Sequence, residues 1–176
     1  MSSSPSWDLL LIVFFVISVG YGFVLQRDKV IVTLLSIYAG IVVANVLAEP
    51  LKLFFVGDKT VFNQVFISAK LSPFTIQTCL FALTVILVSV RSGIGGRSAS
   101  RGALSPFELA VFSFLNSALL LTAIFSFMTP EMRENFIHNS RIANVFIQKQ
   151  TWWVIAPLMT LIATGGLGKS RSNDYY

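Results

Sequence analysis

Long apolar runs separated by short polar segments dominate this chain. Four of them, at residues 9–25, 30–48, 73–90 and 106–128, contain a single charged side chain between them, that of Glu108. As α-helices rising about 1.5 Å per residue they would extend roughly 25–35 Å, which matches the hydrocarbon core of a bilayer. Each run therefore predicts a membrane-spanning helix.

A fifth apolar run, at residues 152–167, is shorter and would extend only about 24 Å as a helix. Trp152 and Trp153 indicate a membrane interface at its start. Its end is marked by Gly165, Gly166 and Gly168. We expect a fifth span here, and the alternative is a re-entrant or interface-bound helix.

Two further segments have helical periodicity but too many polar residues for a span. Residues 60–69 repeat apolar side chains at helical spacing with polar ones opposite. Residues 130–150 place apolar side chains along one side, at Met132, Phe136, Ala143 and Phe146. Both patterns predict amphipathic helices lying in the membrane interface. For residues 60–69, a loop helix packed on the spans is the alternative.

Local chemistry predicts where helices begin and end. Pro73 and the pair Ser105-Pro106 suit helix starts, because the N–H that proline lacks has no partner in a first turn anyway. Thr129-Pro130 repeats that chemistry, with the threonine as the cap. Glu49-Pro50 closes the second run.

The predicted fold class is an all-α integral membrane protein with four to five transmembrane helices and two amphipathic interfacial helices. It forms one polytopic membrane domain over residues 1–168, followed by a short polar tail at 169–176. Composition agrees, since 55% of residues are hydrophobic, 12% are charged and the mean hydropathy is +0.75. These values exclude a water-soluble globule and a disordered chain.

The first two runs carry small residues at a spacing of four. These are Ser18 and Gly22 in the first run and Ser36, Gly40, Ala44 and Ala48 in the second. Such a stripe lets another helix backbone approach closely. Because the connection at residues 26–29 is short, the two runs should form an antiparallel hairpin that packs through these faces. Chance recurrence of small residues is the alternative.

Charge gives an orientation and a lipid partner. The formal charge is +5 and is scattered through the connections, unlike the single basic face of a nucleic-acid binder. The segment after the third run has Arg91, Arg97 and Arg101 and no acid. It predicts a cytoplasmic loop whose arginines contact anionic headgroups, with the N-terminus outside and the tail inside.

The fourth run contains the most notable polar side chains. Glu108 and Asn116 fall on one helical side, and Ser113 and Ser117 adjoin it. Together, with Asn45 of the second run as a candidate partner, they could line a wet cavity or an ion path. The alternative is that Glu108 stabilises the helix start while the amide and hydroxyls bond neighbouring helices.

Catalytic and metal chemistry find no support in the sequence. The single cysteine, Cys79, lies among apolar neighbours, and the single histidine, His138, has no Ser or Cys at a diagnostic spacing. Paired carboxylates and metal-ligand patterns are also missing. We therefore expect no enzyme, no catalytic residues, no metal and no cofactor.

The start of the chain resembles the colicin V production family of small bacterial inner-membrane proteins. The resemblance lies in Asp8 at the head of an apolar helix, Gly22-Phe23-Val24 at its end, the break Arg27-Asp28-Lys29 and Gly40 in the next helix. It extends by layout to Met128. It implies a multi-pass protein of the bacterial inner membrane with a role in toxin export or envelope homeostasis, and it brings no catalytic residues.

Our leading hypothesis is a polytopic helical inner-membrane protein that acts in envelope maintenance or export through helix–helix association with itself or other membrane proteins. The first alternative is a channel or transporter component with a polar cavity at Glu108 and Asn116. The second is an accessory subunit of a larger membrane complex.

Overall fold

The computed structural model describes residues 7–24, 27–56, 72–91 and 106–163. All regular structure in these segments is helical, as predicted. The helices are α1 (Trp7–Val24), α2 (Arg27–Val56), α3 (Pro73–Arg91), α4 (Pro106–Phe127), α5 (Pro130–Asn139), α6 (Arg141–Gln148) and α7 (Gln150–Ala163). The predicted helix at 60–69 and the arginine-rich segment after Arg91 lie outside the described residues.

Four of the described helices are long and apolar enough to cross a membrane. These candidate spans are Trp7–Val24, Lys29–Leu53, Pro73–Arg91 and Pro106–Phe127, with mean hydropathies between 1.9 and 2.4. They match the four long runs of the sequence to within a few residues. The shorter α7 has 14 residues, about 21 Å of helix, so a fifth crossing remains a proposal.

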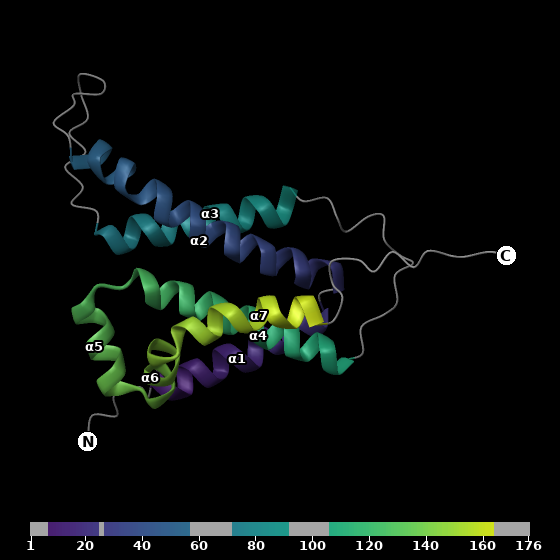
Figure 1. Cartoon of the computed structure of the whole chain (residues 1–176). Helices are drawn as coiled ribbons and strands as arrows, with labels where there is room; N and C mark the ends of the chain where they lie inside the picture. Colours follow the sequence, from purple (N-terminus) through teal and green to yellow (C-terminus); the bar gives the residue numbers. More distant parts are fainter. Residues whose placement is uncertain (1–6, 25–26, 57–71, 92–105, 164–176) are drawn as a thin grey trace.

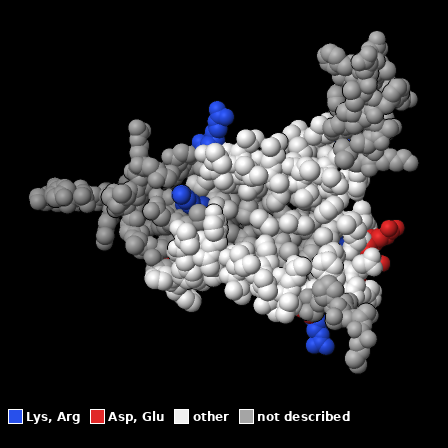
Figure 2. Space-filling model, turned by 180° about the vertical axis from the view of Figure 1, so that it is seen from behind, with Lys and Arg blue, Asp and Glu red and all other residues white. Residues whose placement is uncertain are grey.

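Helix α4 lies in the middle of the molecule. In Figure 1 it runs between α1 on one side and the α2–α3 pair on the other, with α7 alongside. Of the apolar window in α4, 61% is buried, against 11% in α1 and in α3. The outer helices therefore expose apolar side chains, and Figure 2 shows an uncharged surface between the coloured atoms near the two ends.

The ends of the long helices lie at two opposite ends of the molecule, as Figure 1 shows. Helices α1, α3 and α7 finish at one end, where α2 and α4 begin; we call this the α7 end. At the opposite end α1 and α3 begin, α2 and α4 finish, and α5 and α6 lie; we call this the α5 end. This alternation is what successive crossings of one membrane would produce.

Helix α2 passes through the predicted stop at Glu49-Pro50 and ends at Val56, so that boundary was wrong. Pro50 cannot donate to the carbonyl four residues earlier. Proline is nevertheless tolerated in a membrane helix that packs on a neighbour. Ala48, Glu49 and Lys52 line a small hollow together with the first turns of α3, and Lys52 Nζ pairs with Glu49 Oε1 at 3.1 Å.

The predicted helix at 130–150 is divided in two by Ser140, whose backbone is extended (φ −146°, ψ 122°). Its start is as predicted: Thr129 caps α5, and Pro130 occupies the first turn. None of the residues of α5 is buried, whereas α6 buries Ala143 and Phe146. The apolar side is therefore not continuous, because the extended residue changes the helix direction.

Candidate functional site

The amide of Asn116 joins α4 to α2. This side chain is buried, and its Nδ2 donates to the carbonyl oxygen of Val30 at 2.9 Å, while Oδ1 has no partner. Val30 lies in the first turns of α2, so the bond fixes the start of that helix against the middle of α4. A side-chain amide that bonds across two membrane helices stabilises their packing.

The two serines beside Asn116 bond within their own helix. Ser113 Oγ donates to the carbonyl of Leu109, and Ser117 Oγ to the carbonyl of Ser113, both at 2.8 Å. Both serines are buried. Their hydroxyl hydrogens are thus used by backbone carbonyls one turn earlier.

Gly22 of α1 lies directly on Ser113 of α4. A Cβ added to Gly22 would overlap Oγ and Cβ of Ser113. Only the absence of a side chain at Gly22 allows this approach, and the contact closes the surface of α4 beside the serine.

The proposed polar cluster is only partly assembled. Ser113, Asn116 and Ser117 lie together, and Glu108 is part-buried in the first turn of α4, where a carboxylate suits the positive helix end. Asn45 is exposed and lies about 22 Å along α2 from Val30. The suggestion of Asn45 as a partner in this cluster was therefore wrong.

The small residues of α2 face α3. Ser36, Gly40, Ala44 and Ala48 are all buried. A Cβ added to Gly40 would lie 2.9 Å from Cδ2 of Phe81 and 3.0 Å from Cγ2 of Val85. At Ser36, the first residue of the stripe, the hydroxyl accepts a hydrogen bond from Ser89 Oγ of α3 at 3.3 Å.

The expected pairing of α1 with α2 through their small faces was therefore wrong. Helix α1 packs mainly on α4, and α2 packs mainly on α3. Gly22 is buried against α4, and Ser18 is only part-buried. A short connection fixes the opposite directions of two helices, but it leaves room for a third helix between their later turns.

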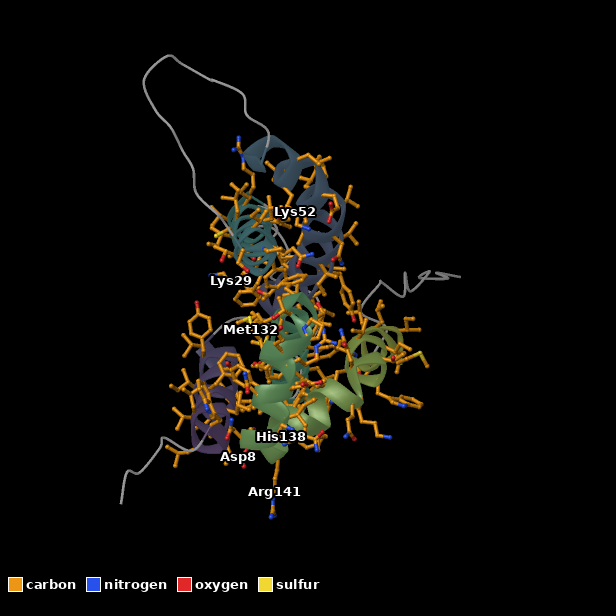
Figure 3. The ribbon with its side chains drawn as sticks, turned by 90° about the vertical axis from the view of Figure 1, so that its left-hand side faces the viewer. Asp8, Lys29, Lys52, Met132, His138 and Arg141 are labelled. Atoms are coloured by element: carbon orange, nitrogen blue, oxygen red, sulfur yellow. The ribbon has the colours of Figure 1, made fainter. Side chains whose placement is uncertain are left out.

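A carboxylate that belongs to none of the predicted sites binds the start of α6. Asp8 Oδ1 accepts hydrogen bonds from Ser140 Oγ at 2.5 Å and from the backbone N–H of Ile142 at 3.2 Å. Figure 3 shows Asp8 beside the junction that His138 and Arg141 flank. The available signals were an acid directly before the first run and a serine within the amphipathic segment at 130–150, but nothing in the sequence predicts a contact between positions so far apart.

Two further side chains that donate hydrogen bonds to another helix were also missed. The hydroxyl of Tyr38 in α2 donates to the carbonyl of Val154 in α7 at 2.5 Å. Arg133 Nη2 donates to the carbonyls of Phe125 and Ser126 at 3.1 and 3.2 Å, at the C-terminal end of α4. A basic residue shortly after a predicted helix end is a recognisable signal for such a cap.

Three further residues named from the sequence, Cys79, Arg91 and His138, are exposed. Arg91 lies at the α7 end, and Arg97 and Arg101 lie outside the described residues. Within the described segments, no three His, Cys, Asp or Glu side chains are grouped so as to hold a metal ion.

Comparisons of the chain with protein-family models, curated proteins and solved structures gave no match.

Proposed function

We propose that this is a multi-pass protein of the bacterial inner membrane that acts in envelope maintenance or export by associating, through its outer helices, with itself or with other membrane proteins. The anionic headgroups of the bilayer are its second partner, through Arg91, Arg97 and Arg101. The N-terminus lies outside and the tail inside. The resemblance of residues 8–40 to the colicin V production family supports this proposal.

The observation that carries the proposal is the outer face of α3. Exposed residues follow one side of this helix from end to end, at Thr75, Cys79, Ala82, Ile86 and Val90. None is charged, and the first three are small, which would let a partner helix come close. Among the described helices, only α2 packs extensively on α3, so with respect to these helices this side is open to lipid or to another membrane protein.

The inner small residues cannot serve such a partner. Gly40 is covered by Phe81 and Val85, and Gly22 is covered by Ser113. Association must therefore use the outer faces. Besides α3, the outer face of α1 offers Gly20, which has no heavy atom near its added Cβ.

Association is favoured over conduction because of how the polar groups of α4 are used. A conducting path needs side chains that face water at membrane depth. The hydroxyls of Ser113 and Ser117 instead donate within α4, and Asn116 donates to α2. Liposome flux compared with Glu108→Gln and Asn116→Leu tests the channel alternative, which requires a flux that both changes reduce.

The native Cys79 provides a direct test of association. We expect oxidative crosslinking in native membranes to join Cys79 to a second copy or to another membrane protein. Ala82→Leu adds bulk one helical turn away and should reduce the crosslink severalfold. Leu83→Ile, which keeps the volume of an exposed neighbour, is the matched control and should leave the crosslink unchanged.

Two outcomes would contradict association through α3. One is the absence of any crosslinked or co-purified partner in native membranes, and the other is a crosslink that Ala82→Leu leaves unchanged. Orientation is tested separately with Ser3→Cys, Ser98→Cys and Ser172→Cys in a Cys79→Ser background. Labelling of the Ser98→Cys protein from outside would invert the proposed topology.

A further inference from the structure

Helices α5 and α6 lie across the end of the molecule where α1 begins (Figure 1). They connect α4 to α7, and they rest on the other helices through different contacts. Helix α5 buries no residue, while α6 buries Ala143 and Phe146 against Leu11 and other residues of α1 and α4. The two short helices are thus attached unequally.

The attachment of α5 to α4 is made by Arg133. Its guanidinium donates to two carbonyls in the last turn of α4, those of Phe125 and Ser126. A positive charge there is also favoured by the negative end of the helix dipole. The ring of Phe136 adds contacts to Phe125 and to Trp7, with centroids 5.8 and 4.8 Å apart.

Asp8 makes the polar contacts between α1 and α6. This carboxylate is the only charged side chain of α1, and one of its oxygens accepts from both Ser140 Oγ and the N–H of Ile142. It therefore lies at the positive end of α6, where an anion is stabilised. The nearby cation is Arg141, which is exposed.

Ser140 lies between these two attachments. Its extended backbone ends α5 and starts α6, and its Oγ accepts from the N–H of Ala143 at 3.0 Å while donating to Asp8. One side chain thus caps α6 and binds it to α1. Lys149, where α6 joins α7, also has a non-helical backbone (φ −104°, ψ 25°). Rotations at Ser140 and Lys149 would move α6 without disturbing the bonds of Arg133.

We propose that α5 and α6 form a strap across the α5 end, that Asp8 fastens it, and that loss of the Asp8 hydrogen bonds lets α6 swing away from α1 about Ser140 and Lys149. Opening leaves α5 on α4 through Arg133. It uncovers Ala143, Phe146 and Leu11, an apolar surface that is closed in the fastened form. Asp8 is the positioning residue of this device.

The test measures the accessibility of α6 in the full chain in lipid nanodiscs. Ala143→Cys in a Cys79→Ser background places a thiol at a position with no exposed area. We expect its maleimide labelling rate to rise about tenfold with Asp8→Ala, as for the loss of a helix N-cap. Asp8→Asn keeps an acceptor oxygen without the charge and should give an intermediate rate.

Hydrogen exchange shows whether the opening is local. With Asp8→Ala, the first amides of α6 should exchange faster while those of α4 and α7 keep their protection. Glu131→Gln, which removes an exposed acid from α5, is the matched control and should leave both measurements unchanged. Ser140→Ala should reproduce the effect of Asp8→Ala, and the two changes together should add little.

The proposal is overturned by unchanged labelling in both Asp8 variants, because α6 would then be held by its apolar contacts alone. It is also overturned if Asp8→Asn or Asp8→Ala lowers protection throughout α4 and α7, or prevents folding. Asp8 would in that case support the whole fold, and no separate strap would exist.

Discussion

Replacement of Gly22 by alanine tests the close contact between α1 and α4. The added Cβ would overlap the Oγ and Cβ of Ser113. Rotation of the serine can move Oγ, but its Cβ is fixed by the backbone of α4. The two helices must therefore separate, or one must bend, to accept a single methyl group.

Gly20 provides the control for this change. It lies two residues earlier in α1, and its added Cβ would have no heavy atom within 4 Å. Alanine in place of glycine stabilises a helix by up to about 1 kcal/mol at either position. That contribution cancels in the comparison, and the overlap at Gly22 should make the Gly22→Ala protein about 1–3 kcal/mol less stable than the Gly20→Ala protein.

The measurement is the free energy of unfolding in mixed micelles, from titration with a denaturing detergent. A double-mutant cycle with Ser113→Gly, which removes the overlapping atoms, should recover most of the loss. Equal stability of the two alanine variants, within about 0.5 kcal/mol, would refute the contact of Gly22 with α4. So would a loss that Ser113→Gly leaves unchanged.

Three further changes test the polar contacts and the length of α2. Asn116→Leu should lower the free energy of unfolding by about 0.5–1.5 kcal/mol through loss of the bond to α2, whereas Asn45→Leu at an exposed position should have no effect; equal effects would contradict the buried bond. Arg133→Met should lower the free energy of unfolding by about 1–2 kcal/mol and raise hydrogen exchange at the end of α4, whereas Lys149→Met, the control, should do neither. Slow exchange at the end of α4 in both variants would contradict the cap. Pro50→Ala should slow exchange in the last turns of α2 by restoring a backbone donor, and unchanged exchange would mean that the helix ends before this residue.

Much of the helical architecture was predictable from local chemistry. The four long apolar helices, the starts at Pro73 and Pro106 and the cap at Thr129 follow from residues within a few positions of each boundary. The end of α2 was not predictable in this way. Glu49 and Lys52 indicate a polar boundary by composition, but their side chains pair at 3.1 Å while the helix continues beside α3.

The candidate site was harder to predict because its bonds join distant segments. Asp8 and Ser140, Tyr38 and Val154, and Asn116 and the carbonyl of Val30 are each separated by many tens of residues. One partner in each pair has an ordinary local role: Asp8 is an acid at a helix start, Tyr38 is an aromatic residue within a helix, and the Val30 carbonyl is part of the backbone. Only the arrangement of the helices gives it a partner.

The small-residue faces show why a correct feature can have an unexpected partner. A stripe of small residues predicts that a neighbouring helix approaches closely, but it does not indicate which helix that is. In α2 the groove over Gly40 is filled by two large side chains of α3, and in α1 the backbone at Gly22 meets a serine. Bulky and small partners both satisfy such a stripe, so its spacing alone does not select between neighbours.

The geometry of α4 explains why its polar residues contact different neighbours. Successive residues of a helix are rotated by about 100°, so Ser113 and Asn116 point about 60° apart. This angle is enough for Ser113 to meet α1 and for Asn116 to meet α2. Phe114, between them in the sequence, meets Trp153 of α7 with ring centroids 6.2 Å apart. Polar residues that share one broad side of the helix in projection therefore contact separate neighbouring helices.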